Sequence, residues 1–187
     1  MIFIASIGKE HEKVKGYDCK GLVKYVSSFN PSKIYVTYVT HKDVETGNFG
    51  EEIRLMLNDT MIGEKLSFRG VDRGKYDKIY NDYINENSKS PEFVIKRNVI
   101  DLINTTVNSY LQSYWKSPET VNSEVTDSLF RAKHKLLISL IPEIEFNTWE
   151  KMHREILDNI EMSELTPNSV ILSDVESRYW FIDHIED

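Results

Sequence analysis

The chain has 187 residues, of which 40% are hydrophobic and 28% are charged, an ordinary balance for a single globular domain over residues 1–187. Its net charge of -7 argues against a nucleic-acid backbone or an anionic membrane surface as the main partner, because both favour a basic face. We therefore expect no direct nucleic-acid binding and no membrane association. The single cysteine, Cys19, excludes an internal disulfide and a thiolate zinc site, and it is typical of a reducing compartment. A cytoplasmic protein is expected.

The first 73 residues alternate between strand and helix patterns. Short apolar or β-branched runs, which are typical of buried strands, are separated by segments with a helical apolar face. The strands are predicted at residues 2–7, 33–40 and 65–72, and the helices between them at residues 19–29 and 50–63. Asn30-Pro31 ends the first helix, because the residue before proline is pushed out of the helical region. This alternation predicts a parallel sheet with right-handed crossovers.

The pattern of residues 75–162 instead predicts a helical layer. Its longest helix begins at Ser90-Pro91, a typical N-cap followed by proline. One face of that helix carries Ile95, Val99, Leu102, Ile103 and Thr106. A fourth strand at residues 168–175 and a closing helix at residues 176–187 follow. The predicted fold is a three-layer α/β domain with a mainly parallel sheet of about four strands. Residues 1–73 and 168–187 form its sheet core, and a large helical insertion separates the third and fourth strands.

Ionisable side chains follow every predicted strand. They are Lys9, Glu10 and His11 after the first strand, His41, Lys42 and Asp43 after the second, Asp72 and Arg73 after the third, and Asp174, Glu176 and Arg178 after the fourth. In an open parallel sheet, ligands bind beyond the carboxyl ends of the strands, so these groups define a candidate site. Loops are polar in general, and simple solvation of many of these side chains is the alternative interpretation.

The first strand ends at Gly8, and His11 follows. A residue without Cβ lets backbone N–H groups approach a ligand, and a neutral imidazole beyond it can ligate a metal or act as a general base. Asp72 can orient His11 or hold a cation, whereas Arg73 or Arg178 can clamp a carboxylate or phosphate. A glycine turn with a solvent-exposed histidine, and a surface ion pair at Asp72 and Arg73, are the structural alternatives.

Other motifs carry less weight. Glu150 and His153 have the Glu-x-x-His spacing of helical metal sites, but the second copy that such sites need is not found. His134 shares an apolar helix face and is interpreted as a core histidine. The sequence contains no P-loop, no G-x-G-x-x-G, no G-x-S-x-G and no H-E-x-x-H.

Four short motifs resemble the TraB / ChaN / erythromycin-esterase / Tiki superfamily. They are "GKEH" at the end of the first strand, the Pro-led strand "NPSKIYVTYV", "FRGVD" at the third strand, and the closing "SRYWFIDHI". The resemblance implies a hydrolase, but this chain lacks the glutamate that ends the second strand in many members and has His41 and Asp43 nearby instead. Tyr179 also replaces the acidic residue that often follows the closing arginine. Both departures argue against metal-dependent hydrolysis and favour a binding role or a lost activity.

A second resemblance covers the first 40 residues. "FIASIG", a helix and "NPSKIYVTYVT" are similar to the start of CRISPR-associated Rossmann-like (CARF) sensor domains, which bind cyclic oligoadenylates. The Gly-Thr-rich strand-to-helix turn of those domains is not found; "NTTVN" lies within a helical pattern.

The sequence thus predicts a hydrolase-like or degenerate hydrolase domain. The predicted catalytic residues are His11, Asp72 and Arg178, and the predicted ligand-binding residues are Gly8, Arg73 and His41. A divalent metal is an open cofactor assignment, with His11 as its candidate ligand. The alternatives are a Rossmann-like module that binds a nucleotide or another small anion, and a protein-interaction domain that uses the helical layer. Oligomerisation is left open.

Overall fold

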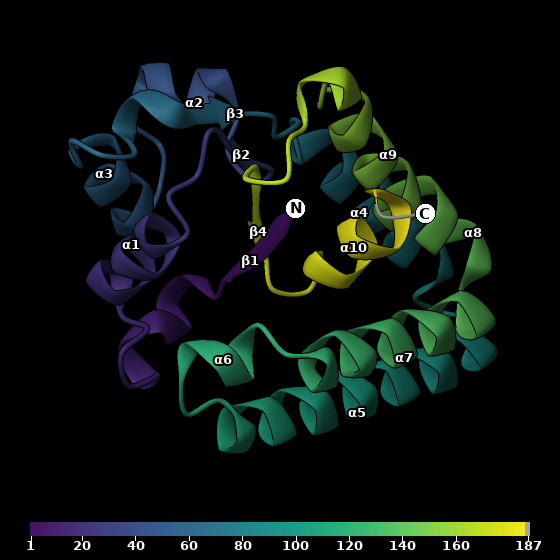
Figure 1. Cartoon of the computed structure of the whole chain (residues 1–187). Helices are drawn as coiled ribbons and strands as arrows, with labels where there is room; N and C mark the ends of the chain where they lie inside the picture. Colours follow the sequence, from purple (N-terminus) through teal and green to yellow (C-terminus); the bar gives the residue numbers. More distant parts are fainter. Residues whose placement is uncertain (186–187) are drawn as a thin grey trace.

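The computed structural model describes residues 1–185, in which a four-stranded sheet lies at the centre of the molecule (Figure 1). The strands are β1 (Ile2–Ser6), β2 (Ile34–Val36), β3 (Leu66–Phe68) and β4 (Val170–Asp174). All pairs are parallel, and the strand order is β1-β4-β2-β3. The predicted three-layer α/β fold, with a helical insertion between the third and fourth strands, is confirmed.

Helices connect the strands. Those before β3 are η1 (Gly8–Lys13), α1 (Cys19–Ser28), α2 (His41–Thr46), α3 (Glu51–Leu57) and η2 (Gly63–Lys65). Those of the insertion are α4 (Gly74–Asn87), α5 (Pro91–Tyr114), α6 (Pro118–Val121), α7 (Glu124–Leu140), α8 (Pro142–Glu145), the π-helical turn η3 (Phe146–Glu150), α9 (Lys151–Asp158) and η4 (Met162–Glu164). The last helix is α10 (Arg178–Ile185); the final two residues of the predicted closing helix lie outside the described residues.

The direction of each crossover determines which face its helices cover. The chain moves one way along the sheet from β1 to β2 to β3, and it moves back from β3 to β4. Because such crossovers are right-handed, the two directions place their helices on opposite faces. In Figure 1, α1 and α3 accordingly lie on one side of the sheet, and α4, α9 and α10 lie on the other.

Local signals explain most helix boundaries. The Asp18 carboxylate accepts a 2.6 Å hydrogen bond from the Gly21 N–H and caps α1, and the helix ends just before Asn30 and Pro31 as predicted. The sequence pattern did not mark α2, which begins directly after the predicted second strand. A capping box formed by Thr40 and Asp43 begins this short helix.

Strands β2 and β3 are shorter than predicted, and the segments that follow them approach each other closely. A Cβ at Gly70 would lie 2.7 Å from backbone atoms of Val39, so only glycine permits this approach. The paired residues of β2 and β4 are fully buried, as expected of central parallel strands.

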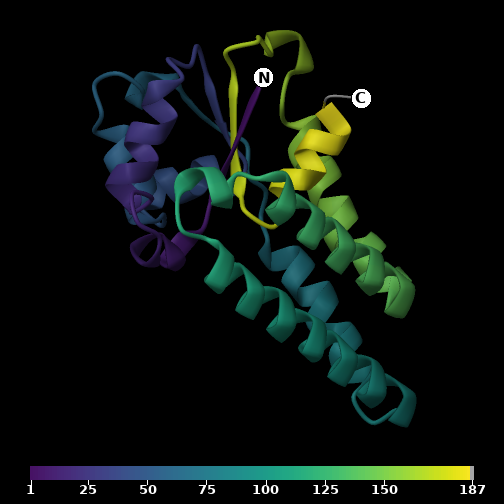
Figure 2. The ribbon, with the colours of Figure 1, turned by 60° about the horizontal axis from the view of Figure 1, so that its bottom comes forward.

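Helices α5 and α7 run side by side across the lower end of the sheet, beyond the carboxyl end of β1 (Figure 1). Ser90 caps α5 and Pro91 occupies its first turn, as predicted. The end at which α4 meets α5 projects well beyond the sheet (Figure 2). Among the helices of residues 1–185, none combines the length and the apolar character needed to cross a membrane.

Side chains from the insertion, from α10 and from the segment before α1 protect the edge strand β1. The Ala5 N–H donates to Asn122 Oδ1 at 2.8 Å, and the Tyr17 hydroxyl donates to the Ala5 carbonyl at 2.6 Å. Arg178 Nε donates to the Phe3 carbonyl at 3.0 Å. These bonds satisfy backbone groups that an edge strand otherwise offers to other chains.

Candidate functional site

A cavity of about 530 Å³ lies at the carboxyl ends of the strands, within the range of small-molecule sites. Ser6 ends β1, Asp174 ends β4, and Tyr38 follows β2, so three strands contribute to its floor. The C-terminal half of α5 supplies another wall with Asn108, Leu111, Gln112 and Trp115. The remaining lining residues are Ile7, Gly8, Glu10, Glu52, Arg73, Phe130, Val175 and Glu176.

Asp174 is held in place from two sides. Arg73 donates from a terminal guanidinium nitrogen to Asp174 Oδ2 at 2.7 Å. Asp174 Oδ1 accepts the Ser177 backbone N–H at 3.1 Å and lies 2.7 Å from the Ser177 hydroxyl. The positive group that lines the cavity, Arg73, is therefore already paired.

Ser177 also connects Asp174 to a buried histidine. The hydroxyl lies 2.7 Å from His153 Nε2, while His153 Nδ1 donates to the Trp149 carbonyl at 2.7 Å. Burial lowers the pKa of His153 to about 4, so its ring is neutral near pH 7. Ser177 is only 1% exposed, and His153 Nδ1 faces a carbonyl rather than a carboxylate. This is a buried network, unlike the accessible nucleophile of a serine hydrolase.

Glu176 belongs to a second buried network, which separates the cavity from a smaller one of about 250 Å³. His134 lies between two carboxylates, with Nε2 2.8 Å from Glu176 and Nδ1 3.1 Å from Glu145. Burial opposes the charge on His134, but the two carboxylates outweigh burial and raise its pKa. Burial likewise opposes the charge on Glu176, yet His134 and Lys133 lower its pKa to about 2. His134 is a core histidine, as predicted, and its two carboxylate partners favour the protonated ring.

Glu52, in contrast, faces the cavity without a cation. Glu52 is 7% exposed. Within residues 1–185, its carboxylate accepts a single long hydrogen bond, of 3.5 Å, from the Tyr38 hydroxyl. Within residues 1–185, no lysine, arginine or histidine forms an ion pair with it. Its place in the first turn of α3 gives partial compensation from the backbone N–H groups. Burial raises the pKa of Tyr38, which therefore stays protonated as a donor.

His11 does not line this cavity; it lies behind Ser6 and Ile7, which do. It is 0% exposed; its Nδ1 donates to the Tyr17 carbonyl at 2.6 Å, and its Nε2 accepts the Ile7 N–H at 3.1 Å. Burial lowers its pKa, which keeps the ring neutral. Because both ring nitrogens are bonded, this arrangement leaves no nitrogen for a metal or a substrate. The catalytic and metal-binding roles of His11 stay predictions that require a different arrangement of the ring.

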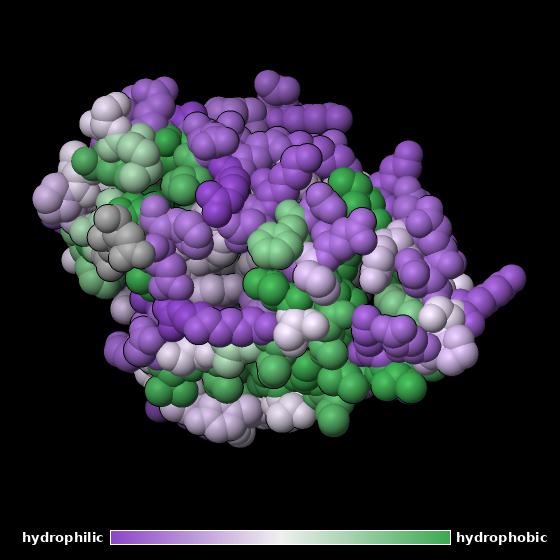
Figure 3. Space-filling view, turned by 90° about the vertical axis from the view of Figure 1, so that its right-hand side faces the viewer, coloured by the Kyte–Doolittle hydropathy of each residue, from purple (hydrophilic) through white to green (hydrophobic). Residues whose placement is uncertain are grey.

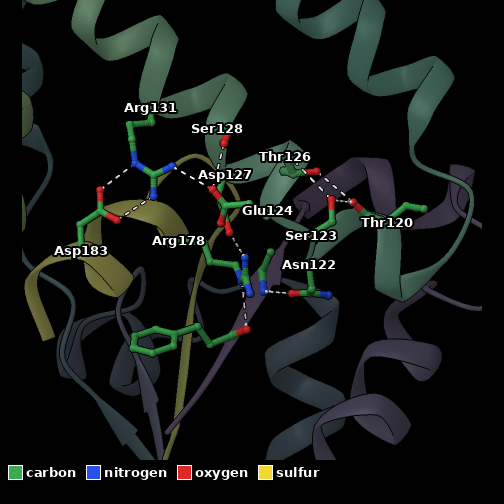
Figure 4. A network of polar contacts seen from close by, with 12 residues as sticks. Thr120, Asn122, Ser123, Glu124, Thr126, Asp127, Ser128, Arg131, Arg178 and Asp183 are labelled. Atoms are coloured by element: carbon green, nitrogen blue, oxygen red, sulfur yellow. Dashed lines mark hydrogen bonds and ion pairs between the residues drawn. The ribbon is translucent and has the colours of Figure 1, made fainter. Parts of the chain in front are cut away.

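Arg178 also lies outside the cavity, in a network between α10 and α7 (Figure 4). It forms a buried ion pair with Asp127 and donates to the Phe3 carbonyl. Burial raises the pKa of Asp127, and Arg178 opposes that shift. Next to this pair, Arg131 makes a two-pronged contact with Asp183 at 2.7 and 2.9 Å. These contacts give Arg178 a structural environment.

The other predicted residues line a separate, polar groove of about 740 Å³ on the far side of Arg73. It brings together His41, Asp72 and Arg73, the last of which lines both spaces. Asp72 Oδ1 accepts the Gly74 N–H at 2.9 Å and thereby caps the start of α4. Of the predicted residues, the cavity itself contains Gly8 and Arg73. Gly8 has a φ of 53°, so it serves a left-handed turn there.

Glu10, Asp174 and Glu176 were predicted as ionisable groups that follow strands. Glu52 and the cavity-lining residues at the C-terminal end of α5 were not predicted. Glu52 lies inside a predicted helix, and a helical glutamate is ordinarily solvated, so no sequence signal marked it. Within the described part of the chain, no group of three or more His, Cys, Asp or Glu side chains is arranged to hold a metal ion.

Comparison with protein-family models, with curated proteins and with solved structures gives no match for this chain. The resemblances to the TraB / ChaN superfamily and to CARF domains therefore stay predictions.

Proposed function

We propose that this chain is a small-molecule-binding domain whose ligand carries an ammonium or guanidinium group held by Glu52. The observation that supports this most is the buried Glu52 carboxylate, which faces the cavity and has no cationic partner within residues 1–185. A buried carboxylate costs free energy unless it is paired, and a ligand cation would provide that pairing.

The walls of the cavity favour the same ligand. Four carboxylates line it: Glu10, Asp174 and Glu176 are paired with cations of the chain, which leaves Glu52 for a ligand cation. Aromatic rings of Tyr38, Trp115 and Phe130 also line it, and aromatic faces attract organic cations. Amide side chains on α5 add neutral hydrogen-bonding groups.

The small anionic ligand predicted from the sequence depends on Arg73. That guanidinium already donates to Asp174, so an anion would have to compete with a charge-assisted hydrogen bond. The hydrolase prediction depends on His11 and Arg178, which do not line the cavity. Binding of a cation without turnover is the better-supported function.

The proposal is tested by thermal unfolding in the presence of two ligand panels. One panel contains organic amines and guanidines, such as putrescine, spermidine and agmatine; the other contains phosphate, nucleotides and cyclic oligoadenylates. A ligand at about a hundred times its Kd stabilises a protein by about 2.7 kcal/mol, a readily measured rise in melting temperature. We expect such a rise with a member of the cationic panel.

Two neighbouring variants provide the matched comparison. Glu52→Gln removes the buried charge, whereas Glu51→Gln removes the neighbouring charge, whose side chain is 61% exposed. The shift should vanish in the first variant and persist in the second. A shift with anions alone that disappears in Arg73→Ala would contradict the proposal and support the anionic alternative. No shift with either panel would also contradict it.

A further inference from the structure

The outer surface of α5 and α7 carries an apolar stripe whose residues are exposed in residues 1–185, apart from the half-buried Leu129. On α5 the stripe consists of Ile95, Val99, Leu102, Thr106 and Tyr110, all exposed. Their spacing of three or four residues places them on one face of the helix. The sequence pattern marked most of these residues as one apolar face, but α5 instead buries Phe93, Ile100, Val107 and Leu111.

Helix α7 continues the same surface. Val125, Leu129, Ala132 and Leu136 follow one another at steps of four, three and four residues, the repeat of a helix-packing seam. A shallow groove between the helices is lined by Tyr110, Val125 and Leu129, which shows that the two stripes adjoin, and Glu124 and Ser128 border it on the α7 side. We call these nine residues the outer α5/α7 face.

The outer α5/α7 face contains no charged side chain, although 28% of the residues in the chain are charged. From Leu102 to Trp115 the sequence of α5 and its end carries no Asp, Glu, Lys or Arg at all. Figure 3 shows a band of hydrophobic residues along the lower edge of the molecule, which is the edge that α5 and α7 occupy in Figure 1. Contiguous exposed apolar surface of this kind marks an interaction site.

We infer that the outer α5/α7 face is the interface of a symmetric homodimer, in which two such helix pairs pack as a four-helix bundle. A two-fold dimer brings the same patch of both copies together, so a charged stripe would repel itself, whereas this uncharged one does not. The heptad-like spacing on both helices fits bundle packing.

The size of the face fits a dimer that depends on concentration. The face runs from Ile95 to Tyr110 on α5 and from Val125 to Leu136 on α7, roughly 24 and 18 Å at about 1.5 Å per residue. With a width of about 10 Å for each helix, the face covers roughly 420 Å². A standard interface buries about 800 Å² per partner, so this face is that of a small interface.

The test is the mass in solution, measured by multi-angle light scattering over a concentration series of the full chain. We expect twice the 21.9 kDa of one chain. Leu102→Glu and Leu136→Glu place a charge on the face of each copy and should give the mass of one chain. Both side chains are exposed in one chain, so each variant should keep the circular dichroism and melting behaviour of a folded protein.

Met61→Glu is the matched control, because Met61 is 61% exposed and Leu102 is 66% exposed, yet Met61 lies next to η2. It should remain dimeric. A wild-type chain that has the mass of one copy at every concentration would overturn the inference. So would dimers that persist in both face variants, or that dissociate equally in Met61→Glu.

Discussion

At the scale of single residues, the clearest lesson is that a histidine at a strand exit is not necessarily a site residue. His11 follows β1 at the position that sequence analysis proposed for chemistry, but the 3₁₀ helix η1 turns its ring inward. There it bonds the Ile7 N–H and the Tyr17 carbonyl, two backbone groups that otherwise lack partners in a dry environment. Its function in this arrangement is to fix the loop that follows β1.

His11→Ala should therefore lower the free energy of unfolding by about 3 kcal/mol, because it removes a buried ring and leaves two backbone groups without partners. His41→Ala, at an exposed histidine, should change it by less than about 0.5 kcal/mol. Denaturant titration of both variants measures the difference. If His11→Ala unfolds like the wild type and loses a turnover that the wild type has, the catalytic prediction is correct instead.

At the scale of elements, buried polar networks join the helical insertion to the end of β4. Glu176, just beyond β4, contacts His134 and Lys133 of α7, and His134 also contacts Glu145 of α8. Arg178 of α10 pairs with Asp127 of α7. The loop from Asp174 to Arg178, which forms one side of the cavity, is thus positioned by the insertion.

The His134 network predicts how stability depends on pH. The pKa of His134 is raised in the folded state, so its contribution is fully present below the ordinary value of 6.5 and is lost as the pH rises through the raised value. The wild type should therefore lose stability above pH 6.5. His134→Gln should remove that slope and cost about 3 kcal/mol near neutral pH, because it leaves the buried Glu145 without its cation and Glu176 with Lys133 alone.

Unfolding free energies measured across the pH range check this sign. His11 and His153 have lowered pKa values in the folded state, so below pH 6.5 the unfolded state binds more protons than the folded state at these two residues. Their contribution to stability is therefore lost as the pH falls. Loss of stability on the acid side should therefore persist in His134→Gln. His184→Gln, at an exposed histidine, is the control and should keep both slopes. Equal alkaline slopes in the wild type and in His134→Gln would show that His134 is not the group responsible.

At the scale of the whole molecule, the order of strands and helices was predictable, because periodicity, Asn30-Pro31 and Ser90-Pro91 are local signals. The position of the cavity followed from the parallel sheet. The residues that line the cavity did not follow. Glu52 lines it and His11 does not, because of the directions in which α3 and η1 turn these side chains. The wall provided by Asn108 and Gln112 depends on long-range packing of α5, which no local pattern encodes.

The exposed face of α5 was difficult to assign for a related reason. Ile95, Val99 and Leu102 have the spacing of a buried stripe, yet a neighbouring stripe of the same helix carries the residues that reach the core. A sequence pattern alone does not distinguish an internal contact from a contact between chains. In one chain this face is exposed, and the mass measurement above tests whether a second copy covers it.

The central claim is that a cation binds between the carboxyl end of the sheet and α5, and hydrogen–deuterium exchange tests its position most directly. Exchange is compared with and without the amine or guanidine that gives the largest thermal shift. We predict slower exchange at residues 6–8, 50–52, 108–115 and 174–177, which surround the cavity, and unchanged exchange at residues 41–48 and 155–159, which border the polar groove. Slower exchange confined to the groove, or no change at any of these segments, would contradict the claim.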